Sequence, residues 1–193
     1  MIDSLMNISA AFGLSTSAGL NAYIPLLIVA LTARFTKLIE LQDPYHHLTS
    51  WWVIGILSVL LVIEMLVDKV PAVDSLNDMI QTFIRPAAGA LLFAANANVI
   101  NDIHPALAIT AGLILAGGVH AAKGVARPMV TASTAGTGNW FVSIVEDIIA
   151  FFVSILSLLL PLFMAVVILI TIALFARWYV RRRRRKAGMA LKT

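Results

Sequence analysis

The stretch "GGVHAAKGVARP", residues 117–128, decides how this chain folds, because it places basic side chains at the end of a long apolar run. His120, Lys123 and Arg127 are spaced i, i+3 and i+7, so on a helix all three project from one face, together with two of the glycines. A lone charge at the centre of a bilayer costs between ~3 and more than ~10 kcal/mol. If the apolar run crosses a membrane, this basic stripe must be paired inside a bundle or reach the membrane edge.

The composition indicates a membrane protein. The chain has 193 residues, is 60% hydrophobic and 12% charged, and has a mean hydropathy of +0.92, whereas about a quarter of the residues of a soluble domain are charged. A membrane helix needs ~20 mostly apolar residues, so a chain of this length holds roughly five or six spans. We therefore predict an all-α, polytopic membrane bundle of about five to six transmembrane or broken helices, with residues 1–180 forming one domain.

The basic residues are concentrated at the C-terminus. Eight of the 14 lysines and arginines lie at or beyond Arg177 with no acid among them, while residues 1–176 carry six basic and ten acidic groups. An arginine run after an apolar helix marks the cytoplasmic side and can touch anionic lipid head groups. We expect residues 181–193 to be a basic cytoplasmic tail of a multi-pass protein of the plasma (inner) membrane, without a nucleic-acid partner.

Turn residues divide the apolar sequence into expected helices. The first covers residues 9–33, broken or bent near Pro25, and the second covers residues 51–67, after a turn at Asp43-Pro44. The third covers residues 75–95 and is bent or discontinuous at Arg85-Pro86. The remaining predictions are a helix at 105–123, a loop at 129–139, and a helical stretch at 140–179 that is divided at Pro161 and begins near Ile144, where Ser143 and Glu146 fit a capping box.

A second polar stripe raises the possibility of an internal repeat. On the third expected helix, one face carries Asp74, Asp78, Gln81 and Arg85. A shift of 69 residues sets the same spacing on Ser143, Asp147, Ala150 and Ser154, and lays "NDMIQTFI" over "EDIIAFFV". Many transporters are built from such repeats. A rival alignment, "VIEMLV" over "IVEDII", uses a different offset, so the repeat is one of two alternatives.

Several acidic side chains are available to pair with the basic stripe. They are Glu64, Asp68, Asp74, Asp78, Glu146 and Asp147. Because intramembrane charges are normally paired and turned inward, we expect one shared network. Two structural alternatives remain open: Lys123 and Arg127 extend to the interface while Glu146 caps a helix, or Asp78 pairs with Arg85 within one bent helix.

The candidate site follows from these patterns. Asn21, in "STSAGLNAYIP" (15–25), joins it because a buried amide needs hydrogen-bond partners. The expected substrate-binding residues are Arg85, His120, Lys123, Arg127 and Asn21; the expected coupling or charge-network residues are Glu64, Asp68, Asp78, Glu146 and Asp147. No cofactor, metal or catalytic residue is expected, because the adjacent His46 and His47 should face different directions and His104 stands alone before Pro105.

Three stretches carry a resemblance to a known family: "SAGLNAY" (17–23), "DKVPAVDSLNDMIQTFIRPAAGALL" (68–92) and "GNWFVSIVED" (138–147). They resemble the bacterial integral membrane proteins of the domain-of-unknown-function 4126 family, over nearly the whole chain. The resemblance implies a small bacterial membrane protein and no established activity. The chain departs from the family pattern at Gln81, where a histidine is frequent, and in "TASTAGTGN", where an acid between prolines is usual, which weakens a proton relay or acid-loop role.

Two functions fit these features. The first is a small transporter or lipid and anion translocator with a charged intramembrane site. The alternative is a non-catalytic membrane assembly or scaffolding subunit, whose glycine faces and polar stripes mate with partner helices. The partners expected are membrane lipids, an anionic small molecule or lipid head group, and further copies of the chain as a homo-oligomer.

Overall fold

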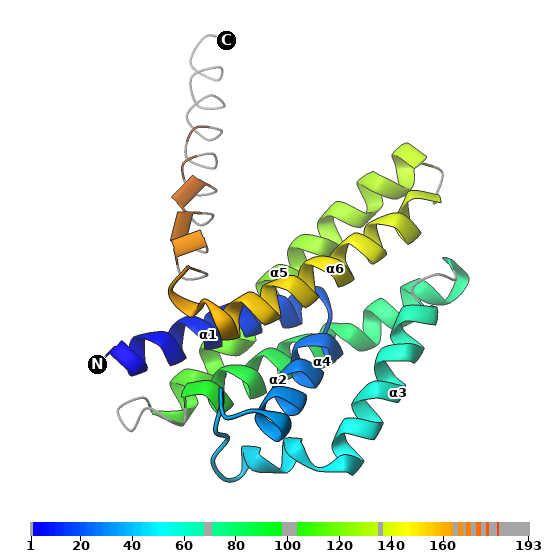
Figure 1. The fold of residues 1–193 in the computed structure, drawn as a ribbon. Helices are drawn as coiled ribbons and strands as arrows, with labels where there is room; N and C mark the ends of the chain where they lie inside the picture. Colours follow the sequence, from blue (N-terminus) through cyan, green and yellow to red (C-terminus); the bar gives the residue numbers. More distant parts are fainter. Residues whose placement is uncertain are drawn as a thin grey trace.

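The computed structural model describes residues 2–67, 71–97, 104–134 and 137–163, and, of the rest, 166–167, 169–170, 173–174, 177 and 181. The expected tail therefore lies outside the described residues, apart from Arg181. Within the described part the chain is all-helical, as predicted, with no strand (Figure 1). The helices are α1 (Ile2–Leu20), α2 (Tyr23–Phe35), the 3-10 helix η1 (Tyr45–Thr49), α3 (Trp51–Val67), α4 (Pro71–Ala97), α5 (Pro105–Thr134) and α6 (Thr137–Leu159).

The helices differ in length and in apolar character. Among the described residues, α5 and most of α6 are long and apolar enough to cross a membrane, and α2 and α3 are shorter apolar helices. Large hydrophobic side chains such as Trp52, Phe83 and Phe152 are exposed on the outside. These features, with the composition, indicate a membrane protein; the number of spans stays a prediction.

The break between α1 and α2 falls at Asn21 and Ala22. Pro25 lies four residues after Asn21, and a proline ring clashes with the carbonyl of residue i−4 and cannot donate to it. The predicted interruption near Pro25 is confirmed, although α1 begins earlier than residue 9.

Helices α4 and α5 are antiparallel and pack closely. A Cβ on Gly112 would overlap the carbonyl oxygen of Gly89, and a Cβ on Gly117 would lie 3.6 Å from Cγ of Pro86. Small residues of this kind let two helix backbones approach. Helix α4 continues through Pro86, so the discontinuous form of the expected helix is wrong, and the bend stays a prediction. We attribute the continuity to this packing, which offsets the helix-breaking cost of proline, about 3 kcal/mol.

The loop expected at 129–139 is also largely helical. Helix α5 runs on to Thr134 and α6 begins at Thr137, so the expected helix end at Lys123 is wrong. The hydroxyls of Thr131 and Thr134 donate to helical carbonyls four residues earlier, at 3.0 and 2.8 Å, instead of forming a polar loop. At the far end, α6 stops at Leu159, which confirms the division at Pro161.

Helix α1 lies against α4, α5 and α6 and forms the centre of the fold (Figure 1). Its buried face is built from Leu14 and small residues such as Ala11 and Ala18. Hydroxyls complete the contacts: Ser15 donates to the Gly89 carbonyl of α4 and Ser17 to the Ala150 carbonyl of α6, both at 2.8 Å. Both helices of the suspected repeat thus contact α1, but the repeat itself stays a prediction.

Candidate functional site: a buried charge network

The basic side chains of α5 face acids from the neighbouring helices. Lys123 Nζ lies 2.7 Å from Glu146 Oε2 of α6, and Arg127 Nη1 lies 2.9 Å from Asp78 Oδ2 of α4. A longer contact of 3.9 Å joins Arg127 to the same Glu146 oxygen. The side chains of Lys123 and Arg127 are only 3% and 8% exposed. Their extension to the interface is therefore wrong, as is the capping role of Glu146, because α6 begins nine residues before it, at Thr137.

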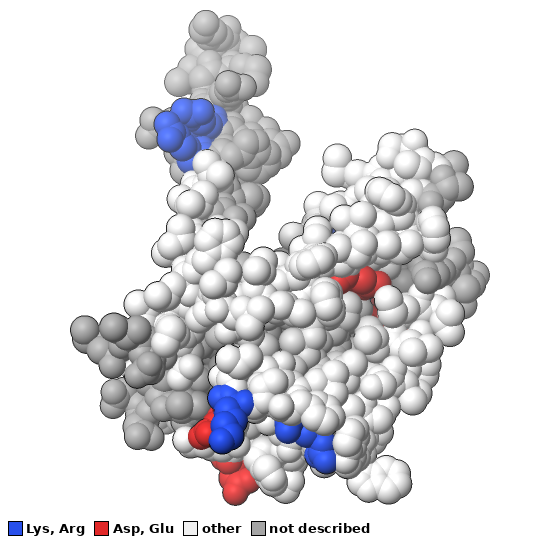
Figure 2. Space-filling view, viewed as in Figure 1, with Lys and Arg blue, Asp and Glu red and all other residues white. Residues whose placement is uncertain are grey.

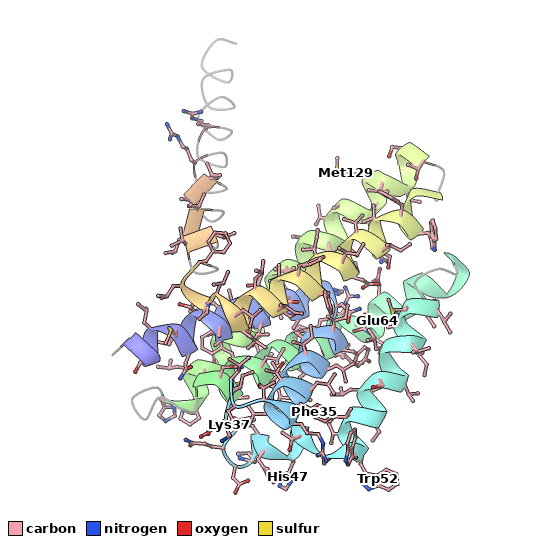
Figure 3. The ribbon with its side chains drawn as sticks, viewed as in Figure 1. Phe35, Lys37, His47, Trp52, Glu64 and Met129 are labelled. Atoms are coloured by element: carbon pink, nitrogen blue, oxygen red, sulfur yellow. The ribbon has the colours of Figure 1, made fainter. Side chains whose placement is uncertain are left out.

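Arg85 of α4 forms its ion pair with a carboxylate of α3. Its Nη2 donates to Glu64 Oε1 at 2.9 Å, and the two side chains are 0% and 1% exposed. Figure 3 shows Glu64 on the inner side of α3. The proposed pair of Asp78 with Arg85 is wrong: seven residues of helix separate them by about 10 Å along the axis, and each reaches a different neighbour.

His120 connects Arg85 to Thr82. Arg85 Nη1 lies 3.3 Å from His120 Nδ1, and His120 Nε2 lies 3.1 Å from the Thr82 hydroxyl. An arginine only donates, so Nδ1 must accept and a neutral His120 carries its proton on Nε2. Thr82 can receive that proton's hydrogen bond because its own hydroxyl donates to the Asp78 carbonyl at 2.8 Å. The network thus assigns one tautomer to His120.

Asn21 sits at the break between α1 and α2 and has the partners that a buried amide requires. Its Oδ1 accepts hydrogen bonds from the backbone N–H groups of Tyr23 and Ile24 at 3.0 and 3.1 Å, which caps α2. Its Nδ2 donates to Asp147 Oδ1 of α6 at 2.9 Å. Asn21 therefore joins the helix break to the charged face of α6.

Seven of the ten predicted site residues thus contact one another in a chain, either directly or through Thr82, and Asn21 and Asp147 form a separate pair. The tenth, Asp68, lies outside the described residues, and so does the side chain of Asp74. Sequence reasoning missed Thr82, although its spacing of i+4 from Asp78 puts it on the same face of α4. Gln81, which is 1% exposed, hydrogen-bonds to Tyr23. Within the described residues, Gln81 Oε1 and Arg85 Nε have no hydrogen-bond partner.

Among the described residues, the ion pairs of this network set three carboxylates against three basic groups. The carboxylates are Glu64, Asp78 and Glu146, and the basic groups are Arg85, Lys123 and Arg127. His120 contacts Arg85, and Asp147 accepts a hydrogen bond from Asn21. Burial strongly disfavours uncompensated charge. The pairing therefore lowers the cost of holding these charges inside the bundle.

The two ends of the network differ in access. At the Arg127 end there is an open pocket of about 430 Å³. It is lined by Asp78, Gly124, Arg127, Pro128, Thr131, Ala132 and Asn139. The Asp78 side chain is 30% exposed there, in contrast to the sealed Glu64. Figure 2 shows acidic atoms in a hollow of an otherwise nearly uncharged region, between α6 and the α3–α4 side of the molecule.

The helical fold, the apolar outer faces and the charges paired in the interior are features of an integral membrane protein. The sequence matches the family described as Domain of unknown function (DUF4126) over residues 8–181, and the chain belongs to that family. Comparison with curated proteins and with solved structures finds no match. The function of that family is unknown, so a function has to be argued from the charge network.

Proposed function

We propose that the protein is a multi-pass plasma-membrane translocator of an anion, either a small molecule or a lipid head group, and that the charge network is its binding and coupling site. The observation that supports this most is the pocket at the Arg127 end. It connects a buried guanidinium, already paired with a carboxylate, to the outside of the bundle. Intramembrane ionisable groups beside a cavity are typical of transport pathways.

Exchange of anions at Arg127 is the first step of the proposed mechanism. A guanidinium binds carboxylate and phosphate oxygens with the same donor geometry. An anion that enters the pocket can therefore take the place of Asp78, which is the more exposed partner of Arg127. Thr131 and Asn139, which also line the pocket, add polar side chains for the remaining oxygens.

Proton binding is the second step. A proton on Asp78 removes its attraction for Arg127 and leaves the guanidinium to the incoming anion. The charged and titratable groups around Asp78 are Arg127 and His120 of α5 and, beyond Arg127, Glu146 of α6. We therefore expect inward anion movement to be accompanied by protons, as in a symporter.

Flux through proteoliposomes tests the proposal. One set of vesicles contains a pH dye and receives a gradient of inorganic phosphate; a second set carries a fluorescent anionic phospholipid whose transfer between leaflets is measured. We expect the wild-type protein to support one of these fluxes and Arg127→Gln to abolish it. Asp78→Asn should retain anion flux but lose the accompanying proton flux, because asparagine cannot take up a proton.

Lys37→Gln is the matched control, since Lys37 is an exposed cation on the connection after α2, outside the network. Equal flux in wild type, Arg127→Gln and protein-free vesicles would refute translocation of either probe.

The assembly-subunit alternative has one observation in its favour. Helix α3 presents an almost wholly apolar shallow groove, lined by Trp51, Trp52, Gly55, Ile56, Val59 and Leu60, on which a partner helix could pack. In that case the ion pairs only hold the bundle together. Copurification of a fixed partner that is lost on Gly55→Leu, with wild-type yield of Arg127→Gln, would favour this function.

A further inference from the structure

The connection between α2 and α3 brings two imidazoles and a carboxylate together, far from the charge network. Ligand atoms of Asp43, His46 and His47 all lie within 4.8 Å of one another, and all three residues are exposed. The His46 and His47 ring centroids are 5.2 Å apart, and His46 Nδ1 lies 3.5 Å from Asp43 Oδ1. Figure 3 shows His47 at the outer end of the molecule, away from Glu64.

This arrangement corrects the expectation that adjacent histidines face different directions. Residues of a 3-10 helix are spaced about 120° apart, so neighbouring Cβ atoms do diverge. On η1, however, both histidines are exposed, and Asp43, three residues before His46, lies within 3.5 Å of the His46 ring. The imidazoles therefore converge beyond their Cβ atoms.

The backbone that carries these side chains is held in place. The Gln42 carbonyl accepts hydrogen bonds from the N–H groups of Tyr45 and His46 at 2.8 and 3.1 Å. The Thr49 hydroxyl donates to the His46 carbonyl at 2.9 Å. Arg34 of α2 fixes the far end, since it donates to the Thr49 carbonyl at 2.6 Å and its guanidinium carbon lies 4.1 Å from the Trp51 ring centroid. A fixed backbone lowers the cost of gathering three ligands.

We propose that Asp43, His46 and His47 bind one divalent transition-metal ion of the zinc type. Two imidazoles with one carboxylate are a common ligand set for Zn²⁺, with a fourth position left open to water. Ca²⁺ and Mg²⁺ prefer oxygen ligands throughout, so they fit poorly. Ligand atoms about 2.0–2.1 Å from zinc lie about 3.3 Å from one another in a tetrahedral site, and side-chain rotation closes the present separation. The site is independent of the proposed translocation.

Metal titration of the tag-free protein in detergent, after treatment with a chelator, tests the site. We expect one equivalent of Zn²⁺ to bind by calorimetry, and Co²⁺ to give the visible absorption of a nitrogen-liganded, low-coordinate site. His46→Ala and His47→Ala should each weaken the affinity by about tenfold or more, since even indirect partners of a metal contribute that much. Excess Mg²⁺ should not compete.

His104→Ala is the matched control, because His104 is an exposed histidine outside the cluster, immediately before α5. It should bind as the wild type does. All variants are first compared with the wild type by gel filtration, and His46→Gln and His47→Gln repeat the test with polar replacements. The proposal is overturned by the absence of saturable Zn²⁺ binding, or by an unchanged affinity in the His46 and His47 variants.

Discussion

The two arginine–carboxylate pairs of the network have the same length but opposite surroundings. Arg85–Glu64 and Arg127–Asp78 are both 2.9 Å long, yet the side chains of the first pair are 0% and 1% exposed and those of the second 8% and 30%. We name them the closed end and the open end. The length of an ion pair alone therefore does not show whether the pair is structural or can exchange its partner. A sealed pair cannot change partners cheaply, whereas a pair beside a pocket can.

The largest effect is expected from breaking the closed end. Glu64→Leu leaves the Arg85 guanidinium buried without its carboxylate, and breaking a buried pair in this way costs about 3–5 kcal/mol of unfolding free energy. The measurement is the thermal unfolding midpoint of the detergent-solubilised protein, followed by tryptophan fluorescence.

The double variant Glu64→Leu/Arg85→Met sharpens this test. Replacing a whole buried pair by apolar residues is often neutral or stabilising, so it should recover most of the lost stability. If the double variant is as unstable as Glu64→Leu, the two residues do not act as a pair and the description of the closed end is wrong.

A smaller effect is expected from the same substitution at two glycines inside α5, one toward each end of the network. Gly112→Ala, near the closed end, places a Cβ against the Gly89 carbonyl oxygen and 2.6 Å from the Ala90 Cα, and backbone atoms cannot yield easily. Overpacking of this kind costs about 1–3 kcal/mol.

Gly124→Ala is the counterpart at the open end, where the added Cβ has no atom within 4 Å. It should stabilise the protein by up to about 1 kcal/mol, because alanine favours a helix over glycine. Equal melting points for the two variants would contradict the contrast between the ends.

The smallest loss is expected from Asp78→Asn at the open end. Arg127 retains Glu146 at 3.9 Å, and partly exposed pairs contribute about 1 kcal/mol or less. The same melting experiment should therefore show a much smaller shift than Glu64→Leu. A loss as large as that of Glu64→Leu would mean that Asp78 is as firmly locked as Glu64, and would remove the basis for anion exchange.

The sequence predicted which residues meet but not how they pair. Helical spacing collected His120, Lys123 and Arg127 on one face, and the cost of burying charge required acids opposite them. Helix rise alone separates Asp78 from Arg85 on α4. Which neighbouring helix each of them reaches depends on the vertical register of α4 against α3 and α5. Register is set by tertiary contacts such as Gly89 against Gly112, which no local pattern encodes.

Helix ends were predicted least well where side chains compete for the backbone. The hydroxyl-rich stretch "TASTAGTGN" favours a loop, because serine and threonine side chains compete for backbone hydrogen-bond partners. In the structure Thr131 and Thr134 return their hydrogen bonds to helical carbonyls, so the same chemistry accompanies a helix. At Pro86 the reason is different: close packing retains a helix that a proline alone would interrupt.

The capping amide of Asn21 has a consequence for biosynthesis. Its partner Asp147 is 126 residues further along the chain, and the partner of Ser17, the Ala150 carbonyl, likewise comes much later in the chain. A ribosome therefore releases the first two helices well before their polar contacts exist. Truncated chains that end before α6 should be cleared quickly by quality-control proteases, because α1 and α2 gain these hydrogen bonds only when the last third of the protein has been made.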